Sequence, residues 1–287
     1  MTLSAMARLE ARIQAVDSML CVGLDSAIER IPERFRREAA PALAFDRWII
    51  DQTHPHVAAY KANMAFYEAR GEQGWHELAE TMVYLRSVDP DIVTICDAKR
   101  ADIDSTNAGY VAGLLDGLGF DAITLHPWLG AEALRPFLSR ADKVSIVLCR
   151  TSNPGAGEFQ DLLVDGAPLW EVVARHVRDD WSAAGNTMLV MGATYPAELR
   201  RARELCPDIG FLVPGVGAQG GDVGEVVRQG ADGRGRGLLI NASRSVILAE
   251  DPGAEARRLR AQIAEAAAEF RGGRPGDPAA ARTGAVS

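Results

Sequence analysis

The stretch IVTICDAKRADIDST, residues 92–106, joins a continuous apolar run to a cluster of charged side chains. Residues 92–97 lack the polar alternation of a half-exposed strand, which is typical of a parallel strand covered on both faces. A helical pattern, residues 106–118, comes shortly after. The stretch therefore predicts one strand–helix unit with polar side chains at the carboxyl end of its strand.

The same pattern recurs along the chain. The eight β-rich apolar runs cover residues 20–24, 57–61, 92–97, 122–125, 144–148, 187–191, 210–213 and 237–240. Helical patterns lie between them, such as residues 43–52, 75–87, 106–118, 169–184, 197–205 and 221–229, and a last one covers 254–270. Eight such units in about 250 residues predict an α/β protein with a (β/α)8 TIM-barrel fold. A doubly wound open sheet is the alternative.

Residues 1–271 are predicted to form this barrel as a single domain. The segment before the first apolar run has the pattern of an amphipathic helix, which we expect to plug the bottom of the barrel. The end of the chain, residues 272–287, contains few large apolar residues and many glycine, proline and alanine residues. Such a composition cannot bury enough apolar surface to fold, so we expect a disordered tail.

Composition excludes several classes of function. The 287 residues carry a net charge of -8, and the pI is about 5.2, whereas a general nucleic-acid binder needs a basic face. No apolar run approaches the roughly 18 residues of a membrane-spanning helix. The first twenty residues lack the layout of a signal peptide. We expect a cytoplasmic protein without nucleic-acid or membrane partners.

The four cysteines are scattered, with no CxxC pair, and are interpreted as reduced thiols. The lysines are more informative, because the chain has only Lys61, Lys99 and Lys143 and its other basic side chains are arginines. Arginine does not deprotonate in proteins, whereas a lysine ammonium is compact and can donate a proton. Lys61 and Lys99 lie at the ends of two apolar runs, so both are candidates for such a role, although chance survival would also explain them.

In a barrel of this kind the active site lies at the carboxyl ends of the strands. The polar positions there are Asp25, Lys61, Asp97, Lys99, His126, Ser152 and the segments 214–217 and 241–244. Asp97 and Lys99 are two residues apart on one strand, so their side chains leave the same face, and Asp102 follows on the turn. A structural ion pair followed by a helix-starting acid would explain these three residues. An alternating set of lysines and aspartates at one rim is costly to bury, however, which favours a catalytic role.

A glycine-rich loop, PGVGAQGGD, follows the seventh apolar run. Its GxGxxG pattern does not fit a dinucleotide site, because that site follows the first strand of its domain. The loops after strands seven and eight of a barrel commonly bind phosphate through backbone N–H groups. Pro214, Gly215 and Gly217 are therefore candidate phosphate-binding residues, and Arg244 could hold a phosphate with two hydrogen bonds. A plain turn and a surface arginine are the alternative.

The segment RTSNPGAGEFQD, residues 150–161, follows the fifth apolar run. Its serine, asparagine, proline and glycine residues suit a mobile loop over the site, or else an ordinary long loop.

Together with LDS (24–26), KAN (61–63) and SRSVI (243–247), these motifs resemble the orotidine 5′-phosphate decarboxylase family. The resemblance covers roughly residues 20–250 and is nearest to the group with the longer chain and the TSNPGA loop.

The resemblance implies roles for the residues that match the motifs of the family. Lys99 would donate a proton to C6 of the pyrimidine, and Asp97 would face the substrate carboxylate. Lys61 and Asp25 would bind the ribose hydroxyls and order the charges. Ser152 would contact the edge of the pyrimidine.

Other implied roles concern the phosphate and a second subunit. Gln219 and Arg244 would hold the phosphate, together with backbone N–H groups near Gly217 and Arg244. Asp102 would reach into the active site of the partner in a homodimer, with Thr106 beside the ribose. His126 receives no catalytic role, and we interpret it as a buried structural histidine.

The chemistry implied by the resemblance needs no cofactor and no metal ion. Loss of CO2 from a ring carbon leaves a carbanion, and the sequence contains neither a recognisable cofactor motif nor a cluster with metal-ligand spacing. An ammonium beside the carbanion would stabilise it and then protonate it. Two alternatives remain open: a Mg2+-dependent sugar-phosphate lyase or decarboxylase of the same superfamily, and a barrel that binds nucleotide phosphates without catalysis.

Overall fold

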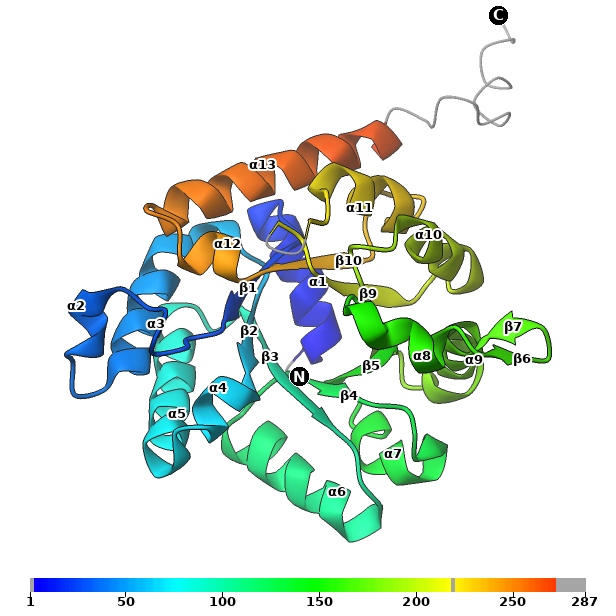
Figure 1. Cartoon of the computed structure of the whole chain (residues 1–287), viewed down its shortest axis with the longest axis horizontal. Coiled ribbons are helices and arrows are strands. Elements are labelled where there is room, and N and C mark those ends of the chain that lie inside the picture. The colour runs from blue at the N-terminus through cyan, green and yellow to red at the C-terminus, as the bar shows by residue number, and fades with distance from the viewer. Residues whose placement is uncertain (1–2, 218–219, 272–287) are drawn as a thin grey trace, which may run out of the picture.

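The computed structural model describes residues 3–217 and 220–271, and its main feature is a closed barrel of parallel strands (Figure 1). In spatial order the strands are β1 (Leu20–Leu24), β10 (Leu238–Ala242), β9 (Gly210–Pro214), β8 (Thr187–Met191), β5 (Val144–Arg150), β4 (Ala122–Leu125), β3 (Val93–Arg100) and β2 (Ala59–Asn63). The predicted TIM barrel is confirmed, and the open sheet is excluded because β1 pairs with both β2 and β10. The expected tail, residues 272–287, lies outside the described residues.

Helices surround the barrel on its outer side (Figure 1). The longer ones are α3 (Pro41–Thr53), α5 (Gly71–Val88), α6 (Asp104–Tyr110), α7 (Gly130–Leu138), α9 (Leu169–His176), α10 (Pro196–Leu205), α11 (Val223–Gly230) and α13 (Pro252–Arg271). Short helices are α2 (Glu33–Arg36), α4 (Met64–Glu68), α8 (Gly157–Gln160) and α12 (Arg244–Ile247). A small hairpin, β6 (Leu163–Val164) and β7 (Ala167–Pro168), projects after α8. The helices α6 and α9 each continue into a π-helical segment, residues 111–117 and 177–181.

Two apolar layers follow from the alternation of side chains along the strands. On β3, Val93 and Ile95 belong to the cluster inside the barrel, whereas Cys96 belongs to the cluster between the barrel and the helices. Asp97 and Lys99 continue the inward-facing series of Val93 and Ile95. The strand therefore directs both charged side chains to the inside of the barrel, at its carboxyl end.

The amino end of the barrel is closed by helix α1 (Ala5–Val16), which Figure 1 shows across the middle of the strand ring. Ala5 and Leu9 pack into the inner apolar cluster. Arg12 donates hydrogen bonds to the carbonyl groups of His54 and Val57, which precede β2. The site is therefore accessible only from the opposite, carboxyl end of the described barrel.

Several strands extend beyond the predicted apolar runs. β3 continues to Arg100 and β5 to Arg150, and β10 includes Asn241, which pairs in register with Cys21 of β1. The apolar pattern ends where the inner side chains become polar, but the ladder of backbone hydrogen bonds does not depend on side-chain polarity. The strand predicted at residues 57–61 is shifted to Ala59–Asn63, because residues 54–56 form a turn of 3₁₀-helix.

No helix in the described part of the chain is long and apolar enough to cross a membrane.

Candidate active site

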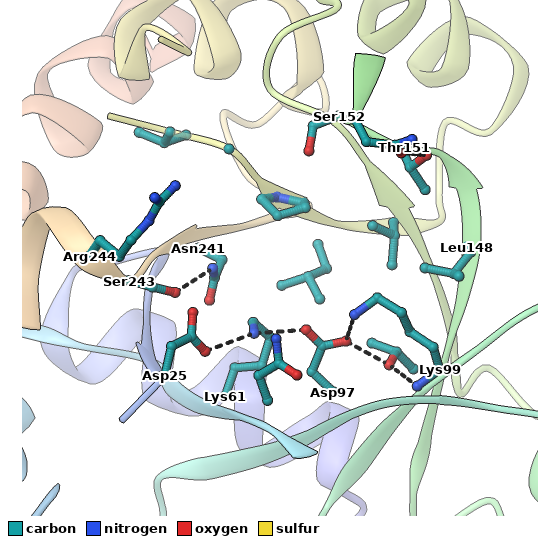
Figure 2. A pocket seen from close by; sticks show the side chains of 18 of the residues that line it. Asp25, Lys61, Asp97, Lys99, Leu148, Thr151, Ser152, Asn241, Ser243 and Arg244 are labelled. Carbon is teal, nitrogen blue, oxygen red and sulfur yellow. Dashed lines mark hydrogen bonds and ion pairs between the residues drawn. The ribbon is translucent and has the colours of Figure 1, made fainter. Parts of the chain in front are cut away.

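A cavity of about 510 Å³ opens at the carboxyl ends of the barrel strands (Figure 2). Eight of the predicted site residues line it, namely Asp25, Lys61, Asp97, Lys99, Ser152, Pro214, Gly215 and Arg244. They come from the ends of β1, β2, β3, β5 and β9 and from the start of α12. The barrel therefore brings together residues that are more than two hundred positions apart in the sequence.

One carboxylate, Asp97, connects the two lysines of the site (Figure 2). Lys61 Nζ lies 2.9 Å from Asp97 Oδ2, and Lys99 Nζ lies 2.7 Å from Asp97 Oδ1. Asp25 Oδ1 is 3.8 Å from Lys61 Nζ on the other side. The four side chains thus form an alternating row of charges, Asp25–Lys61–Asp97–Lys99, along one wall of the cavity.

Thr124 on β4 fixes the geometry of this row. Its hydroxyl donates to Asp97 Oδ1 at 2.9 Å and accepts a hydrogen bond from the backbone N–H of Lys99, also at 2.9 Å. Lys99 itself has φ = 49°, a left-handed conformation that costs a non-glycine residue roughly 1–2 kcal/mol. The hydrogen bond from Lys99 N to Thr124 helps to hold this conformation at the end of β3.

The two lysines differ in exposure. The side chain of Lys61 is only 4% exposed, whereas that of Lys99 is 50% exposed. The ammonium of Lys61 lies between the carboxylates of Asp25 and Asp97. Lys99 is the ammonium that a bound ligand can reach.

Electrostatic coupling determines the charge states of the buried members. Burial raises the pKa of Asp97, but the ammonium groups of Lys61 and Lys99 outweigh burial and hold this pKa well below its usual value. Burial lowers the pKa of Lys61, but Asp97 and Asp25 outweigh it and keep this pKa above its ordinary value. Both side chains are therefore charged at neutral pH.

Part of the cavity lining is apolar. Leu148 on β5, Val190 on β8 and Leu212 on β9 line it, and Val190 and Leu212 belong to the inner core of the barrel. The cavity therefore offers a bound ring both apolar side chains and the ammonium of Lys99.

Arg244 and the glycine-rich loop form another end of the cavity. Within residues 3–217 and 220–271, no acidic side chain lies within ion-pair distance of Arg244. Gly215 and Gly217 have φ values of 101° and 74°, which only glycine adopts without strain. The N–H of Gly217 donates to the Gly221 carbonyl at 3.2 Å, so an anion bound there would compete with that carbonyl.

Comparison with known proteins identifies the family of the chain. The model of the orotidine 5′-phosphate decarboxylase / HUMPS family matches residues 18–259. The chain belongs to this family. It is 45% identical over 260 residues to the orotidine 5′-phosphate decarboxylase of Herpetosiphon aurantiacus, covering 90% of this chain and 95% of that one.

Solved structures of family members have the same barrel. OMP decarboxylase from Leishmania donovani superposes with a TM-score of 0.83 at 37% identity, covering 92% of this chain and 99% of that one. UMP synthase from the same organism gives a TM-score of 0.86 at 39% identity. The superposition covers 93% of this chain but only 57% of the UMP synthase, which is the longer protein.

Some residues predicted from the family motifs lie outside the cavity of their own chain. Asp102 and Thr106 are absent from the cavity lining and lie beyond the end of β3, where Thr106 is exposed. Asn107 holds this turn, because its side-chain oxygen accepts from Asp102 N at 2.8 Å and its amide donates to Ala133 O at 2.6 Å. Ile103, next to Asp102, is 62% exposed.

Two further predictions concern single residues. His126 is half-buried, and its Nε2 lies 3.1 Å from the Ala101 carbonyl, outside the cavity lining. Gln219 falls outside the described residues, so its predicted contact with phosphate stays a prediction.

Sequence reasoning missed several polar residues of the site. Asn63, Thr124 and Gln160 also line the cavity. Asn241, which was predicted to lie at the carboxyl end of its strand but received no role, lines the cavity too. Thr124 and Asn241 stand at positions that continue the inward-facing series of Ala122 and Leu239. A search for polar residues at inward-facing positions could have found Thr124. The side-chain oxygen of Asn241 is buried and has no hydrogen-bond partner among residues 3–217 and 220–271.

The low pKa of Asp97 predicts a pH-dependent contribution to stability. Because this pKa is lowered in the folded state, the stabilisation is present above the unfolded pKa of about 4 and is lost as the pH falls below it. Asp97→Asn should therefore lower the melting temperature at pH 7, and the difference from wild type should shrink below pH 4. Asp91→Asn is the matched control, because Asp91 is exposed and forms no ion pair with another described residue. An Asp97→Asn effect that is the same at pH 3 and pH 7 would contradict the ionised array.

Proposed function

We propose that this protein converts orotidine 5′-phosphate to UMP and CO2, the last step of de novo pyrimidine synthesis. The observation that carries the proposal is the Lys61–Asp97–Lys99 row, in a cavity whose lining also includes apolar side chains and Arg244, which has no acidic partner among the described residues. This arrangement suits a flat, charged ring attached to a phosphate. The family membership of the chain supports the same activity.

The substrate would be bound at several points. The pyrimidine would lie against Leu148, Val190 and Leu212, with Ser152 at its polar edge. Asp25 and Lys61 would bind the ribose hydroxyls. Arg244 would hold the phosphate, together with Pro214, Gly215, Gly217 and Gln219 from the glycine-rich loop.

Asp97 would act on the substrate carboxylate. Two unit charges at about 4 Å repel each other by roughly 4 kcal/mol at an effective dielectric constant of 20. This repulsion disappears as CO2 leaves, so it would favour the transition state over the bound substrate. Contacts with the distant phosphate would provide the binding energy that offsets it.

Lys99 would complete the reaction. Departure of CO2 leaves the bonding electron pair on C6, where the Lys99 ammonium would stabilise the negative charge and then transfer its proton to that carbon. Lys61 would maintain the field and keep Asp97 ionised. Every step would be performed by side chains of the protein, without a cofactor.

The Mg2+-dependent alternative fits the site less well. Asp97 is the acidic residue at the centre of the cavity, and each of its oxygens already accepts a hydrogen bond from a lysine. A divalent cation would have to displace one of these ammonium groups.

We also propose that the active protein is a cytoplasmic homodimer with shared active sites. Asp102 and Thr106 lie outside the cavity of their own chain, beside the exposed Ile103. A twofold axis near this turn would bring the Asp102 of each chain to the cavity of the other. Thr106 would then lie near the ribose.

The activity is tested directly with purified protein treated with EDTA. Addition of orotidine 5′-phosphate should produce a loss of the orotate absorbance, with UMP and CO2 as the products. Activity that requires added Mg2+ would support the sugar-phosphate alternative, and binding of UMP without turnover would support the non-catalytic one.

Arg244→Ala should weaken the binding of UMP far more than that of uridine, because only UMP carries the phosphate. A charge-assisted hydrogen bond contributes roughly 1.5–3 kcal/mol, which corresponds to about a 10- to 150-fold change in dissociation constant. Calorimetric titration of both ligands measures the difference. Equal weakening of the two would show that Arg244 does not bind the phosphate.

A mixed dimer tests the shared active site. Lys99→Ala and Asp102→Ala homodimers should both be nearly inactive. In a mixed dimer, one site carries both substitutions and the other is wild type, so random mixing should restore roughly a quarter of wild-type activity. The measurement is activity after refolding the two variants together, with subunit exchange followed by tags. Exchange without recovery would mean that Asp102 does not act in the partner's site.

A further inference from the structure

A buried carboxyl group lies behind the end of strand β1, outside the cavity. Asp46 belongs to α3. Helices α3 and α4 both pack against α5, and the three helices lie outside strands β1 and β2 (Figure 1). Its side chain is fully buried. The mechanism described above makes no use of Asp46, yet its hydrogen bonds lead to the residues on either side of Asp25.

Three hydroxyl groups surround the Asp46 carboxyl. The Ser26 hydroxyl donates to Oδ1, and Thr81 lies 3.3 Å from Oδ2. The Tyr67 hydroxyl lies 2.8 Å from Asp46 Oδ2 and 3.1 Å from the carbonyl oxygen of Leu24. Leu24 and Ser26 flank Asp25, so this network holds the backbone that carries the first charge of the catalytic row.

The hydrogen bonds of Tyr67 require one more proton than the phenol has. A tyrosine hydroxyl has a single proton, and here it has two acceptors within hydrogen-bond distance. If Asp46 carries a proton on Oδ2, the carboxyl donates to the Tyr67 oxygen, and Tyr67 can then donate to Leu24. With a neutral Asp46, the Tyr67 hydroxyl can donate to the Leu24 carbonyl while it accepts from Asp46. With an ionised Asp46, the carboxylate and the Leu24 carbonyl compete for the single proton of Tyr67.

The charges around Asp46 also favour its neutral form. No lysine, arginine or histidine of the described chain lies within ion-pair distance of its carboxyl group. On α5 the nearby acid is Glu77, which Arg70 pairs. On the β1 side the nearby acid is Asp25. The pKa of Tyr67 on α4 is raised, chiefly by burial and then by the charge of Asp46, so the phenol stays protonated. Burial raises the pKa of Asp46 to about 7 against the opposing hydrogen bonds from its hydroxyl partners.

We propose that Asp46 is a positioning residue that works as a neutral acid. Its O–H donates a hydrogen bond to the Tyr67 oxygen, Tyr67 donates to the Leu24 carbonyl, and Ser26 donates to the other oxygen of the carboxyl group. The network sets the position of Asp25 beside Lys61, and so it affects ribose binding. The effect on KM rests on the proposed function, whereas the effect on the melting temperature does not.

The sign of the pH effect follows from the direction of the shift. A carboxyl group whose pKa is raised by folding stabilises the protein fully below its unfolded pKa, and this stabilisation is lost as the pH rises towards the folded value. The wild-type protein should therefore lose stability between about pH 4 and pH 7 on account of Asp46. Above pH 7 the ionised carboxyl would accept the hydrogen bond of the Tyr67 hydroxyl in place of the Leu24 carbonyl, and so loosen the Leu24–Ser26 turn.

The test is Asp46→Asn, because asparagine reproduces the donor and acceptor of a neutral acid and cannot ionise. At pH 6 the variant should keep its KM within about twofold of wild type. Above pH 7 the KM of wild type should rise by about 2- to 10-fold, the effect of one lost neutral hydrogen bond, and that of the variant should not. Its melting temperature should match wild type near pH 4 and exceed it by several degrees at pH 8.

Two further variants complete the design. Asp51→Asn is the matched control, since Asp51 is an exposed acid on the same helix that also accepts a hydrogen bond from a tyrosine, Tyr84. It should follow wild type at every pH. Tyr67→Phe removes the link to Leu24, so its KM should be raised at pH 6 as well as at pH 8.

The stability and kinetic results separate the possible failures. If Asp46→Asn is less stable than wild type by the same amount at pH 5 and pH 8, the carboxyl is ionised and the proposal is overturned. If the melting temperatures behave as expected but KM does not depend on Asp46, the positioning role is overturned. Absence of decarboxylation in wild type would instead refute the proposed function and leave the stability result intact.

Discussion

The sharing of one half-buried carboxylate, Asp97, between two ammonium groups is the interaction on which the rest of the site depends. The ammonium groups of Lys61 and Lys99 hold the pKa of Asp97 below its usual value, and Asp97 and Asp25 keep the pKa of Lys61 above its ordinary value. Removing Lys61 or Asp97, the less exposed members of the row, leaves an uncompensated charge, which is far more costly than removing both partners. The row therefore has to be built as a unit, and the barrel is what holds it together.

The fold separates stability from chemistry along the axis of the barrel. At the amino end, α1 inserts Ala5 and Leu9 into the inner apolar core, and the strands begin with apolar side chains. At the carboxyl end the same inward-facing positions become Asp97, Thr124 and Asn241. The free-energy cost of burying these polar residues is offset by the apolar layers below them and by the hydrogen bonds among them.

Much of this arrangement could be predicted from the sequence, because continuous apolar runs indicate strands and their polar ends indicate the rim. Asp25, Lys61, Asp97 and Lys99 follow from that reasoning alone. Thr124 does not, since a threonine within an apolar run is also an ordinary strand residue. Asp46 could not be predicted either, because its partners come from three other segments that only the packing of α3, α4 and α5 brings together.

The central claim is that the Lys99 ammonium exchanges a proton with C6 of the pyrimidine. Since every step is reversible in principle, the protein should also remove the C6 proton of bound UMP slowly, and in D2O it should replace that proton with deuterium. Proton NMR of UMP incubated with the protein measures this exchange at C6. The account predicts exchange with wild type and none above background with Lys99→Ala, provided that UMP still binds. Undiminished exchange in Lys99→Ala would contradict it.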